Sequence, residues 1–314
     1  MTRNYATSSG FLLLCPGQGA QHGAMFDLAR SHPQANALLA RLAPALPALD
    51  GDLFANRAAQ PLVAAATLAT WEALRAAAPP PALVAGYSIG ELAAYGVAGA
   101  FGAKQTVALS HLRAQAMDDC LIDHPGQALV AMSGLLVQQA IAVAATHGFV
   151  LSIETGDDSC IAGGPADQAD ELAQAAMAAG GRATRLPVTV ASHTPYMAGA
   201  VQPFAQALEQ QDFSPMSAPV LAGISAIAIN DKPRAVDQLS RQLAQPIRWA
   251  ACMDACAEAG ITYALELGPG NALSRMLQAR HPHINTRSVA DFRTLDGIQK
   301  WLARAANEHL GASY

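Results

Sequence analysis

The chain has 314 residues, 52% of them hydrophobic and 14% charged, a composition typical of a compact globular protein rather than a disordered chain. Its net charge of -5, with no cluster of Lys or Arg, argues against a nucleic-acid partner. The apolar runs are too short for a membrane span or a signal-peptide core, so no membrane association is expected. Five cysteines without repeated C-x-x-C pairing favour reduced thiols and a cytoplasmic location.

Two short apolar runs open a predicted α/β core with parallel strands. Residues 11–15 (FLLLC) and 82–86 (ALVAG) are each followed by turn residues, which indicates strands buried on both faces. Helical patterns at about 22–46 and 61–77 separate them. This alternation predicts a parallel sheet covered by helices.

The pattern changes between residues 127 and 195. Strand-like and helical segments there follow the order β-α-β-β-α-β, which predicts a small ferredoxin-like subdomain whose last strand includes LPVTVAS. After 195 the helix and strand pattern returns, with strands at SAPVLAGIS and TYALELG and a terminal helix after GPGNAL. We therefore predict a core made of residues 1–126 and 196–314, with residues 127–195 inserted in it.

The stretch GYSIGELAAYG at 86–96 places Ser88 between Gly86 and Gly90 at a predicted strand-to-helix turn. Such a turn lifts a serine hydroxyl out of the sheet, and the glycines leave room where side chains would collide. Glycine and serine also favour turns for conformational reasons alone. The pentapeptide by itself leaves both interpretations open.

A second glycine turn, PGQGAQHG at 16–23, follows the first predicted strand. It superficially resembles a dinucleotide-binding fingerprint, but its spacing departs from G-x-G-x-x-G and no acidic residue ends a strand about 20 residues later. Backbone N–H groups at such a turn also suit a developing negative charge on a carbonyl oxygen. Neither a cofactor nor a metal is expected.

A serine nucleophile needs a base, and the chain has nine histidines. His193 stands out because it follows LPVTVAS, where the inserted segment returns to the core, and His22 in the first glycine turn is the alternative. No acidic residue between Ser88 and His193 stands out as the group that orients the ring. A backbone carbonyl could orient the ring instead.

Arg113, in LSHLRAQAM, lies on the helix predicted after Ser88. One interpretation is an exposed helix cation whose stem covers apolar surface. The second interpretation is a receptor for a carboxylate, because a planar guanidinium binds a carboxylate through two hydrogen bonds and keeps its charge when desolvated. An arginine facing Ser88 would select acyl groups that end in a carboxylate.

Six motifs, in this order along nearly the whole chain, carry a family resemblance: PGQGAQ, GYSIGE, LRAQAM, ASHTPYM, RQLAQPIRW and ELGPGNAL. Together they resemble the malonyl-CoA:acyl carrier protein transacylases and the related acyltransferase domains of polyketide synthases. The resemblance implies a hydrolase-like α/β core with an inserted ferredoxin-like subdomain. It also implies malonyl-CoA and an acyl carrier protein as partners.

The resemblance further implies roles for three residues. Ser88 would accept the malonyl group from coenzyme A and pass it to the phosphopantetheine thiol of the carrier protein. His193 would act first as general base and then as general acid. Arg113 would bind the malonyl carboxylate.

Four further positions match the family motifs. Gln18 and Ile89 would offer backbone N–H groups as an oxyanion hole. Gln60 matches a glutamine that lines the pocket. Gln242 matches the position whose backbone carbonyl orients the histidine, which would explain the missing acid.

Three features depart from the common family pattern: Tyr87 replaces a histidine, Glu154 replaces an asparagine, and VASH resembles the pattern associated with branched extender units. With GELAAYGVAG and ASHTP, they resemble the transacylase subunit of malonate decarboxylase, which loads malonyl onto a dedicated carrier protein. Three competing functions are a serine thioesterase or esterase, a nicotinamide-dependent oxidoreductase and a non-enzymatic scaffold subunit.

Overall fold

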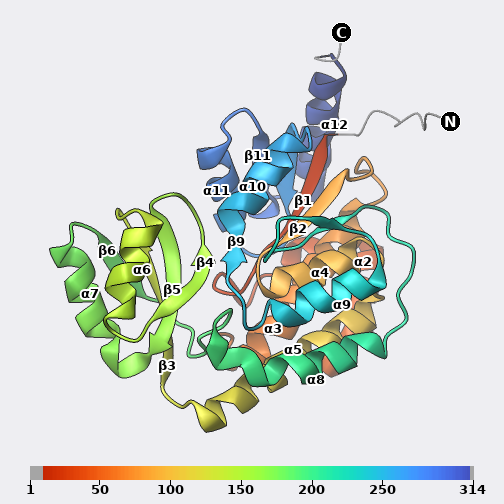
Figure 1. Ribbon diagram of the computed structural model, residues 1–314. Helices are drawn as coiled ribbons and strands as arrows, with labels where there is room; N and C mark the ends of the chain where they lie inside the picture. The colour runs from red at the N-terminus through yellow and green to blue at the C-terminus, as the bar shows by residue number, and fades with distance from the viewer. Residues whose placement is uncertain (1–9, 312–314) are drawn as a thin grey trace.

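The computed structural model describes residues 10–311, which form a mixed α/β fold with two sheets (Figure 1). The larger sheet has six strands in the order β11-β10-β1-β2-β7-β8, and the smaller has five in the order β6-β3-β5-β4-β9. The strands of the larger sheet are β1 Phe11–Cys15, β2 Leu83–Gly86, β7 Val220–Leu221, β8 Ala228–Ile229, β10 Tyr263–Glu266 and β11 Asn285–Ser288. Those of the smaller sheet are β3 Gln127–Ser133, β4 Val150–Glu154, β5 Ser159–Pro165, β6 Arg182–Arg185 and β9 Ile247–Arg248.

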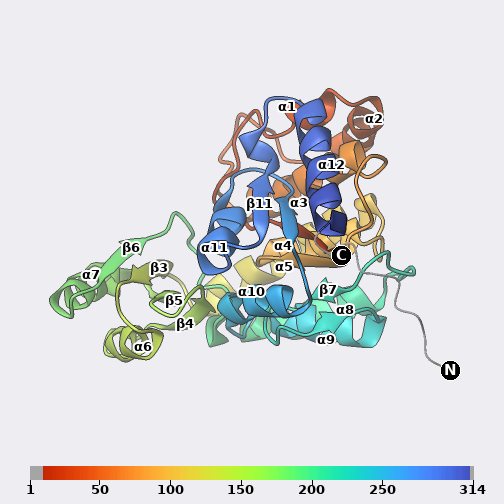
Figure 2. The same cartoon turned by 90° about the horizontal axis from the view of Figure 1, so that it is seen from above.

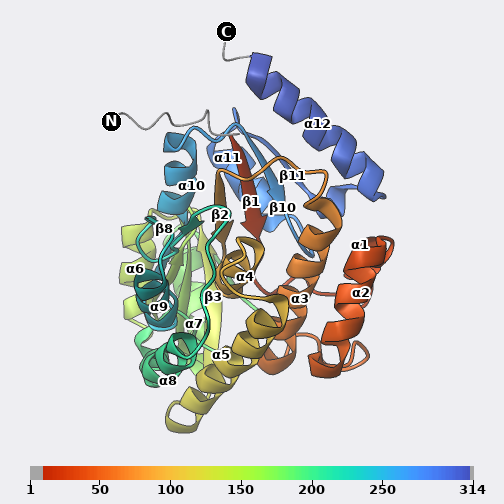
Figure 3. The same cartoon turned by 90° about the vertical axis from the view of Figure 1, so that its right-hand side faces the viewer.

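Helices cover both faces of the larger sheet, and Figure 3 shows α3 on one side of β1 and α10 on the other. Helices α3, α4, α5, α8, α9 and α12 pack on one face, α10 and α11 on the other, and α1 and α2 lie outside α3. The first six are α1 Asp27–Arg30, α2 Pro33–Leu42, α3 Asn56–Leu74, α4 Ile89–Val97, α5 Ala103–Asp123 and α6 Val137–Ala145. The remaining six are α7 Ala169–Ala178, α8 Ala198–Glu209, α9 Lys232–Arg241, α10 Trp249–Glu258, α11 Ala272–Arg280 and α12 Leu295–Gly311.

The burial of β1 on both faces of the sheet explains why its apolar run is continuous. Phe11, Leu13 and Cys15 pack into the cluster under α3 and α4, whereas Leu12 and Leu14 pack under α10 and α11. Because successive side chains of a strand point to opposite faces, a strand buried on both sides needs apolar residues at every position. Strands β11, β10, β1, β2 and β7 run parallel, as expected, and β8 is antiparallel to β7 at the edge.

Residues 127–185 contribute four strands and two helices in the order β3-α6-β4-β5-α7-β6, which is the predicted order of elements. These elements extend from one side of the molecule (Figures 1 and 2). The fifth strand of their sheet is β9, whose Ile247 pairs in parallel with Ile153 of β4. The smaller sheet is therefore completed by a segment far along the chain.

Several boundaries differ from the sequence prediction. The segment LPVTVAS is not a strand, because β6 ends at Arg185 and Pro187 then interrupts the pattern with a residue that has no N–H to donate to a strand ladder. The helical pattern at 22–46 is divided into α1, α2 and a short 3-10 helix. The single terminal helix expected after GPGNAL is α11, followed by β11 and α12. Within the described residues, no helix has both the length and the apolar character that a membrane crossing requires.

Candidate active site

Ser88 occupies a sharp turn between β2 and α4. Its φ of 57° and ψ of -118° place it in a region that side-chain-bearing residues rarely adopt. The flanking glycines make the turn possible, because a Cβ at Gly86 would overlap the carbonyl of Gly90, and a Cβ at Gly90 would overlap the carbonyl of Cys15. Ser88 is the N-cap residue of α4, yet its hydroxyl makes no capping hydrogen bond. The hydroxyl is therefore free for another partner.

That partner is His193, which is fully buried and also has a positive φ, of 62°. Its Nε2 lies 2.8 Å from Ser88 Oγ, and its Nδ1 lies 2.6 Å from the backbone oxygen of Gln242. A carbonyl oxygen only accepts hydrogen bonds, so Nδ1 carries the proton and Nε2 of the neutral ring accepts from the serine. The histidine is thus held in the tautomer that a general base requires.

The group that orients the ring of His193 is a backbone carbonyl at a helix end, where a conventional catalytic triad has an acid. Gln242 follows the last residue of α9, where the final carbonyls have no partner within the helix and carry part of the negative end of the helix dipole. The main-chain N–H of His193 also donates to the carbonyl of Leu243, at 2.8 Å. Burial and the nearby Arg113 charge lower the pKa of His193 to about 3, although the bond to Gln242 opposes this shift. The ring is therefore neutral at physiological pH.

Arg113 lies beside the same serine. It is 1% exposed, and its Nη2 is 3.4 Å from Ser88 Oγ. Shorter bonds run from Nη1 to Gln60 Oε1, at 2.9 Å, and from Nη2 to Gln242 Oε1, at 3.0 Å. Burial lowers the pKa of Arg113 to about 10, so the guanidinium stays charged at neutral pH. The interpretation as an exposed helix cation is wrong.

Five of the predicted site residues therefore meet: Ser88, His193, Arg113, Gln60 and Gln242. They come from the start of α4, the segment after β6, helices α5 and α3, and the end of α9. The alternative histidine, His22, is exposed in the first glycine turn.

Gln18 lies in the loop after β1, and Ile89 lies in the serine turn after β2. A Cβ at Gly17 would lie 2.9 Å from the carbonyl of Tyr87, so the loop that holds Gln18 runs against the serine turn. Ile89 is the first residue of α4. Within residues 10–311, the backbone N–H groups of Gln18 and Ile89 donate to no acceptor. Both groups are therefore available to a ligand.

Sequence reasoning missed a buried acid, Glu91, three residues after Ser88. It is fully buried, and its Oε2 accepts hydrogen bonds from Gln242 Nε2 and from the backbone N–H of Gly223. An acidic residue inside the otherwise uncharged helix IGELAAYGV was the signal that could have identified it. Burial raises its pKa to about 7, despite these hydrogen bonds and the charge of Arg113.

Two residues that depart from the common family pattern, Tyr87 and Glu154, each lie against a defined neighbour. The ring of Tyr87 packs edge-on against Trp249 of α10, with 5.2 Å between ring centroids. Glu154 ends β4 and lies opposite Arg248 of β9.

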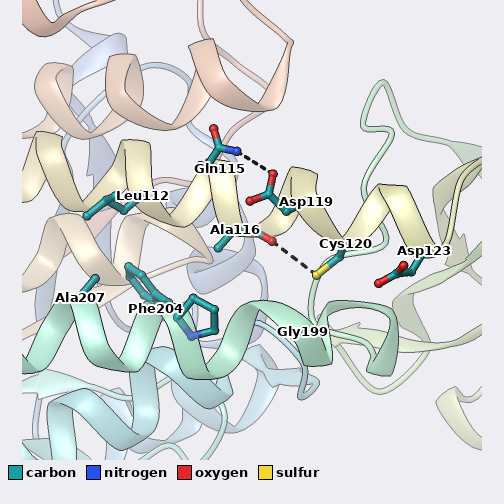
Figure 4. Close-up of a pocket in the computed structure, with 10 residues that line it drawn as sticks. Leu112, Gln115, Ala116, Asp119, Cys120, Asp123, Gly199, Phe204 and Ala207 are labelled. Atoms are coloured by element: carbon teal, nitrogen blue, oxygen red, sulfur yellow. Dashed lines mark hydrogen bonds between the residues drawn. The ribbon is translucent and has the colours of Figure 1, made fainter.

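A separate surface pocket lies between α5 and α8 (Figure 4). It has a volume of about 320 Å³, and Leu112, Cys120 and Phe204 are among its lining residues. Of the described residues that line it, none belongs to the serine site. Among residues 10–311, no group of three or more His, Cys, Asp or Glu side chains is arranged to hold a metal ion.

A serine with a neutral histidine at hydrogen-bonding distance, set on an α/β fold, defines the class of serine enzymes that form acyl intermediates. Within that class, the chain belongs to the acyl transferase family, because the family model described as "Acyl transferase domain" matches residues 12–282. The family assignment favours acyl transfer over an oxidoreductase or a scaffold subunit.

Named relatives agree with this assignment. The malonyl CoA-acyl carrier protein transacylase of Salmonella typhimurium is 28% identical, with 94% of this chain and 98% of that protein covered. The protein of the same name from Mycobacterium tuberculosis is 29% identical, with 91% and 98% covered. The predicted resemblance to this family is thereby confirmed.

Solved structures agree as well. The malonyl-CoA:acyl carrier protein transacylase of Xanthomonas oryzae superposes with a TM-score of 0.87 at 27% identity, covering 95% of this chain and 99% of that one. The acyl carrier protein S-malonyltransferase of Vibrio cholerae gives a TM-score of 0.83 at 28% identity, with 92% and 99% covered. The mixed α/β fold class is confirmed.

Proposed function

We propose that this chain transfers a malonyl group from malonyl-CoA to the phosphopantetheine thiol of an acyl carrier protein. One observation carries the proposal: Ser88 Oγ lies 2.8 Å from the histidine that would activate it and 3.4 Å from a buried guanidinium. The first contact suits nucleophilic attack, and the second suits an acyl group that ends in a carboxylate. The names of the relatives support the same reaction.

In the first half-reaction, His193 Nε2 takes the proton of Ser88 Oγ as the oxygen attacks the thioester carbonyl. The backbone N–H groups of Gln18 and Ile89 would stabilise the oxyanion, a contribution of about 3 kcal/mol per donor. When the carbon–sulfur bond breaks, the imidazolium returns its proton to the coenzyme A sulfur. The product is a malonyl ester of Ser88.

In the second half-reaction, the carrier thiol gives its proton to His193 Nε2 and attacks the serine ester. The carbon–oxygen bond breaks, and Ser88 Oγ recovers the proton. The partial negative charge of the Gln242 carbonyl stabilises the imidazolium in both halves. Because that partner is a carbonyl, no carboxylate is needed beside the ring.

Arg113 would bind the malonyl carboxylate. Its two longest contacts, to Ser88 Oγ and to Met117 Sδ at 3.4 Å each, are the ones a carboxylate would replace. The shorter bonds to Gln60 and Gln242 would remain and hold the guanidinium plane. A malonyl group fixed in this way favours attack by the carrier thiol over attack by water, and so distinguishes the transferase from an esterase.

The finer features of the fold are also part of the proposal. The strand order β6-β3-β5-β4 supports a ferredoxin-like subdomain, and the parallel strands with a serine turn after β2 support a hydrolase-like core. We propose the boundaries 1–126, 127–195 and 196–314, of which residues 1–9 and 312–314 lie outside the described part. All five cysteines are free and buried, which supports a cytoplasmic location.

The relatives named above are acyl carrier protein transacylases, so we propose that reaction rather than the role of a malonate decarboxylase subunit. Tyr87 and Glu154 remain the positions at which the chain differs from the common family pattern.

Intact-mass spectrometry tests the proposal. Mixing the protein with malonyl-CoA is expected to add one malonyl group, and adding a malonyl-free carrier protein is expected to remove it. Ser88→Ala should form no adduct. If the wild-type protein forms no adduct with malonyl-CoA, or forms one that only water discharges, the proposed function is wrong.

A further inference from the structure

The buried carboxylate of Glu91 is joined to the serine site through a single amide side chain. Its Oε2 accepts from Gln242 Nε2 and, at 2.9 Å, from the backbone N–H of Gly223. Within residues 10–311, its second oxygen, Oε1, has no hydrogen-bond partner. The hydrogen bonds of this carboxylate therefore all come from Gly223 and Gln242.

The side-chain amide of Gln242 faces a hydrogen-bond acceptor at one end and a hydrogen-bond donor at the other. Its Nε2 donates to Glu91, and its Oε1 accepts from Arg113 Nη2 at 3.0 Å. The Arg113 guanidinium can only donate hydrogen bonds, and the Glu91 oxygen that faces Gln242 Nε2 can only accept them. Nε2 also donates to the backbone oxygen of Ser88, at 3.3 Å. Only one orientation of the amide satisfies these neighbours, and Glu91 makes the shorter of the two bonds that hold Nε2.

The other terminal nitrogen of Arg113, Nη1, also donates to the oxygen of an amide side chain that is itself held by a second partner. Gln60 Oε1 accepts from Arg113 Nη1, and Gln60 Nε2 donates to Asn56 Oδ1 at 2.6 Å. Asn56 Nδ2 in turn donates to Asp118 Oδ1 at 2.8 Å. Two chains of hydrogen bonds thus start from the two terminal nitrogens of the guanidinium, and each ends on a carboxylate. The repetition indicates that the amide orientations are set from outside the site.

We propose that Glu91 is a positioning residue for the acyl carboxylate: it fixes the Gln242 amide with its oxygen toward Arg113, and so keeps the guanidinium directed at Ser88. This inference rests on the proposed function, since it assigns Glu91 a part in recognising the terminal carboxylate. Glu91 acts only through Gln242 and Arg113 and touches no reacting atom.

Replacing Glu91 with glutamine would leave the network intact, because the amide oxygen can take the place of Oε2 and the amide nitrogen that of the unpartnered Oε1. Methionine instead keeps the length of the side chain and removes both oxygens. Gln242 Nε2 would then keep only its longer bond, to the Ser88 carbonyl at 3.3 Å, and would hold the amide less firmly against Arg113. We expect the guanidinium to move and the recognition of the carboxylate to weaken, while the backbone bond from Gln242 to His193 remains.

The test compares malonyl-CoA with acetyl-CoA as donors for single-turnover acylation of Ser88, at about pH 8, where Glu91 is ionised. Glu91→Met is expected to lower the ratio of malonyl to acetyl kcat/KM about tenfold or more, with most of the loss in KM for malonyl-CoA. The acetyl reaction, which does not use the guanidinium, should change less than about threefold.

Glu266→Met is the matched control. Glu266 is also a buried glutamate, 1% exposed, with a pKa raised by burial to about 7, but it accepts from the backbone N–H groups of Leu273 and Ser274 at the start of α11. Its replacement removes a buried carboxylate outside the network of Arg113. The malonyl to acetyl ratio of this control should stay within about twofold of wild type.

A folded Glu91→Met protein with the wild-type ratio would overturn the inference, and so would an equal loss in Glu266→Met. Should Glu91→Met fail to fold, Gln242→Met decides, because it removes the amide and keeps the backbone carbonyl that holds His193. The inference requires the same loss of ratio there, and a retained ratio rejects it. A wild-type protein without a malonyl adduct would instead contradict the proposed function.

Discussion

Arg113 is a cation with almost no access to water, and its surroundings do not neutralise it directly. Its nearest polar partners, Gln60 and Gln242, are neutral amides, and Glu91 lies one amide further away. A buried charge without a direct counter-ion is costly. Under the proposed function, an incoming carboxylate would supply that counter-ion, so the burial of Arg113 would favour acyl groups of opposite charge.

Arg113→Ala is therefore expected to change the choice of substrate rather than the chemistry. Malonyl transfer should fall about 100-fold, because a bidentate contact to a charged group is lost, while acetyl transfer should be retained or rise. Steady-state assays with both donors measure the change, and Arg75→Ala, which removes a surface ion pair with Glu72, is the control. If malonyl transfer survived in Arg113→Ala and acetyl transfer did not rise, the assigned role would be wrong.

His193 leads to a prediction about the acid side of the pH profile. Because burial and the Arg113 charge lower its pKa to about 3, the ring remains an unprotonated base well below the ordinary histidine value of 6.5. Single-turnover acylation of Ser88 by acetyl-CoA, which does not use the guanidinium, followed by quenched mass spectrometry from about pH 8 to 5, should show no half-maximal point near pH 6.5.

Glu91, whose pKa is raised to about 7, is a second group near the site that titrates in this range. Repeating the profile in Glu91→Gln separates the two groups. A decline centred on pH 6.5 that persists in Glu91→Gln would show that His193 has an ordinary pKa.

At the scale of elements, the turn between β2 and α4 carries strain at Ser88, which the proposed role of this residue as nucleophile would explain. Ser88→Ala and Ser88→Gly both remove the hydroxyl, but only glycine adopts a φ of 57° without a steric penalty. Ser88→Gly should therefore unfold at higher urea than Ser88→Ala, by about 1 kcal/mol in the free energy of unfolding, and neither should form an adduct. Equal stability of the two variants would mean that the turn is unstrained.

How far the sequence predicts an element depends on how much of its environment is local. Strand β1 was predictable because burial on both faces requires an unbroken apolar run over Phe11–Cys15. Strands β7, β8 and β9 are two residues long each, and such short segments depend on their neighbours in the sheet rather than on their own pattern. The segment LPVTVAS has the composition of a strand, but its pairing with β3 ends at Leu186, whose N–H donates to the carbonyl of Leu129 at 2.8 Å, and the chain then crosses toward the core.

The same distinction applies to the site. Ser88, His193 and Arg113 were predictable because each belongs to a motif of the family resemblance. The Glu91 carboxylate lies within the serine motif but has no visible role until the fold brings Gln242 and Gly223 to it. Contacts of this kind join residues that are far apart along the chain, and no local pattern reports them.

At the scale of the whole molecule, the smaller sheet is connected to the site through backbone contacts. Arg248 of β9, the strand that pairs with β4, donates its N–H to the carbonyl of Gly223 at 2.8 Å. The N–H of Gly223 donates to Glu91, which holds Gln242. The position of the smaller sheet and the orientation of the amide beside Arg113 are therefore linked through the backbone of Gly223 and the hydrogen bonds on either side of it.

The buried acids also predict how stability depends on pH. Glu91 and Glu266 both have pKa values raised from 4.5 to about 7 by burial, so the stability they contribute is fully present below pH 4.5 and is lost as the pH rises through 7. His193 has the opposite sign, because its pKa is lowered from 6.5 to about 3, and its contribution is lost as the pH falls from 6.5 to 3. Of these three groups, only the two glutamates change the stability above pH 6.5.

The free energy of unfolding in urea should therefore fall between about pH 6.5 and pH 8, by about 1 kcal/mol for each of the two carboxyl groups. Glu266→Gln should lose about half of this dependence, because one of the two raised pKa values is gone. Glu72→Gln, at a surface ion pair, should keep the wild-type slope. A slope in Glu266→Gln equal to that of wild type would mean that the Glu266 carboxyl titrates alike in the folded and unfolded chain, and that its burial is relieved by the N–H groups of Leu273 and Ser274.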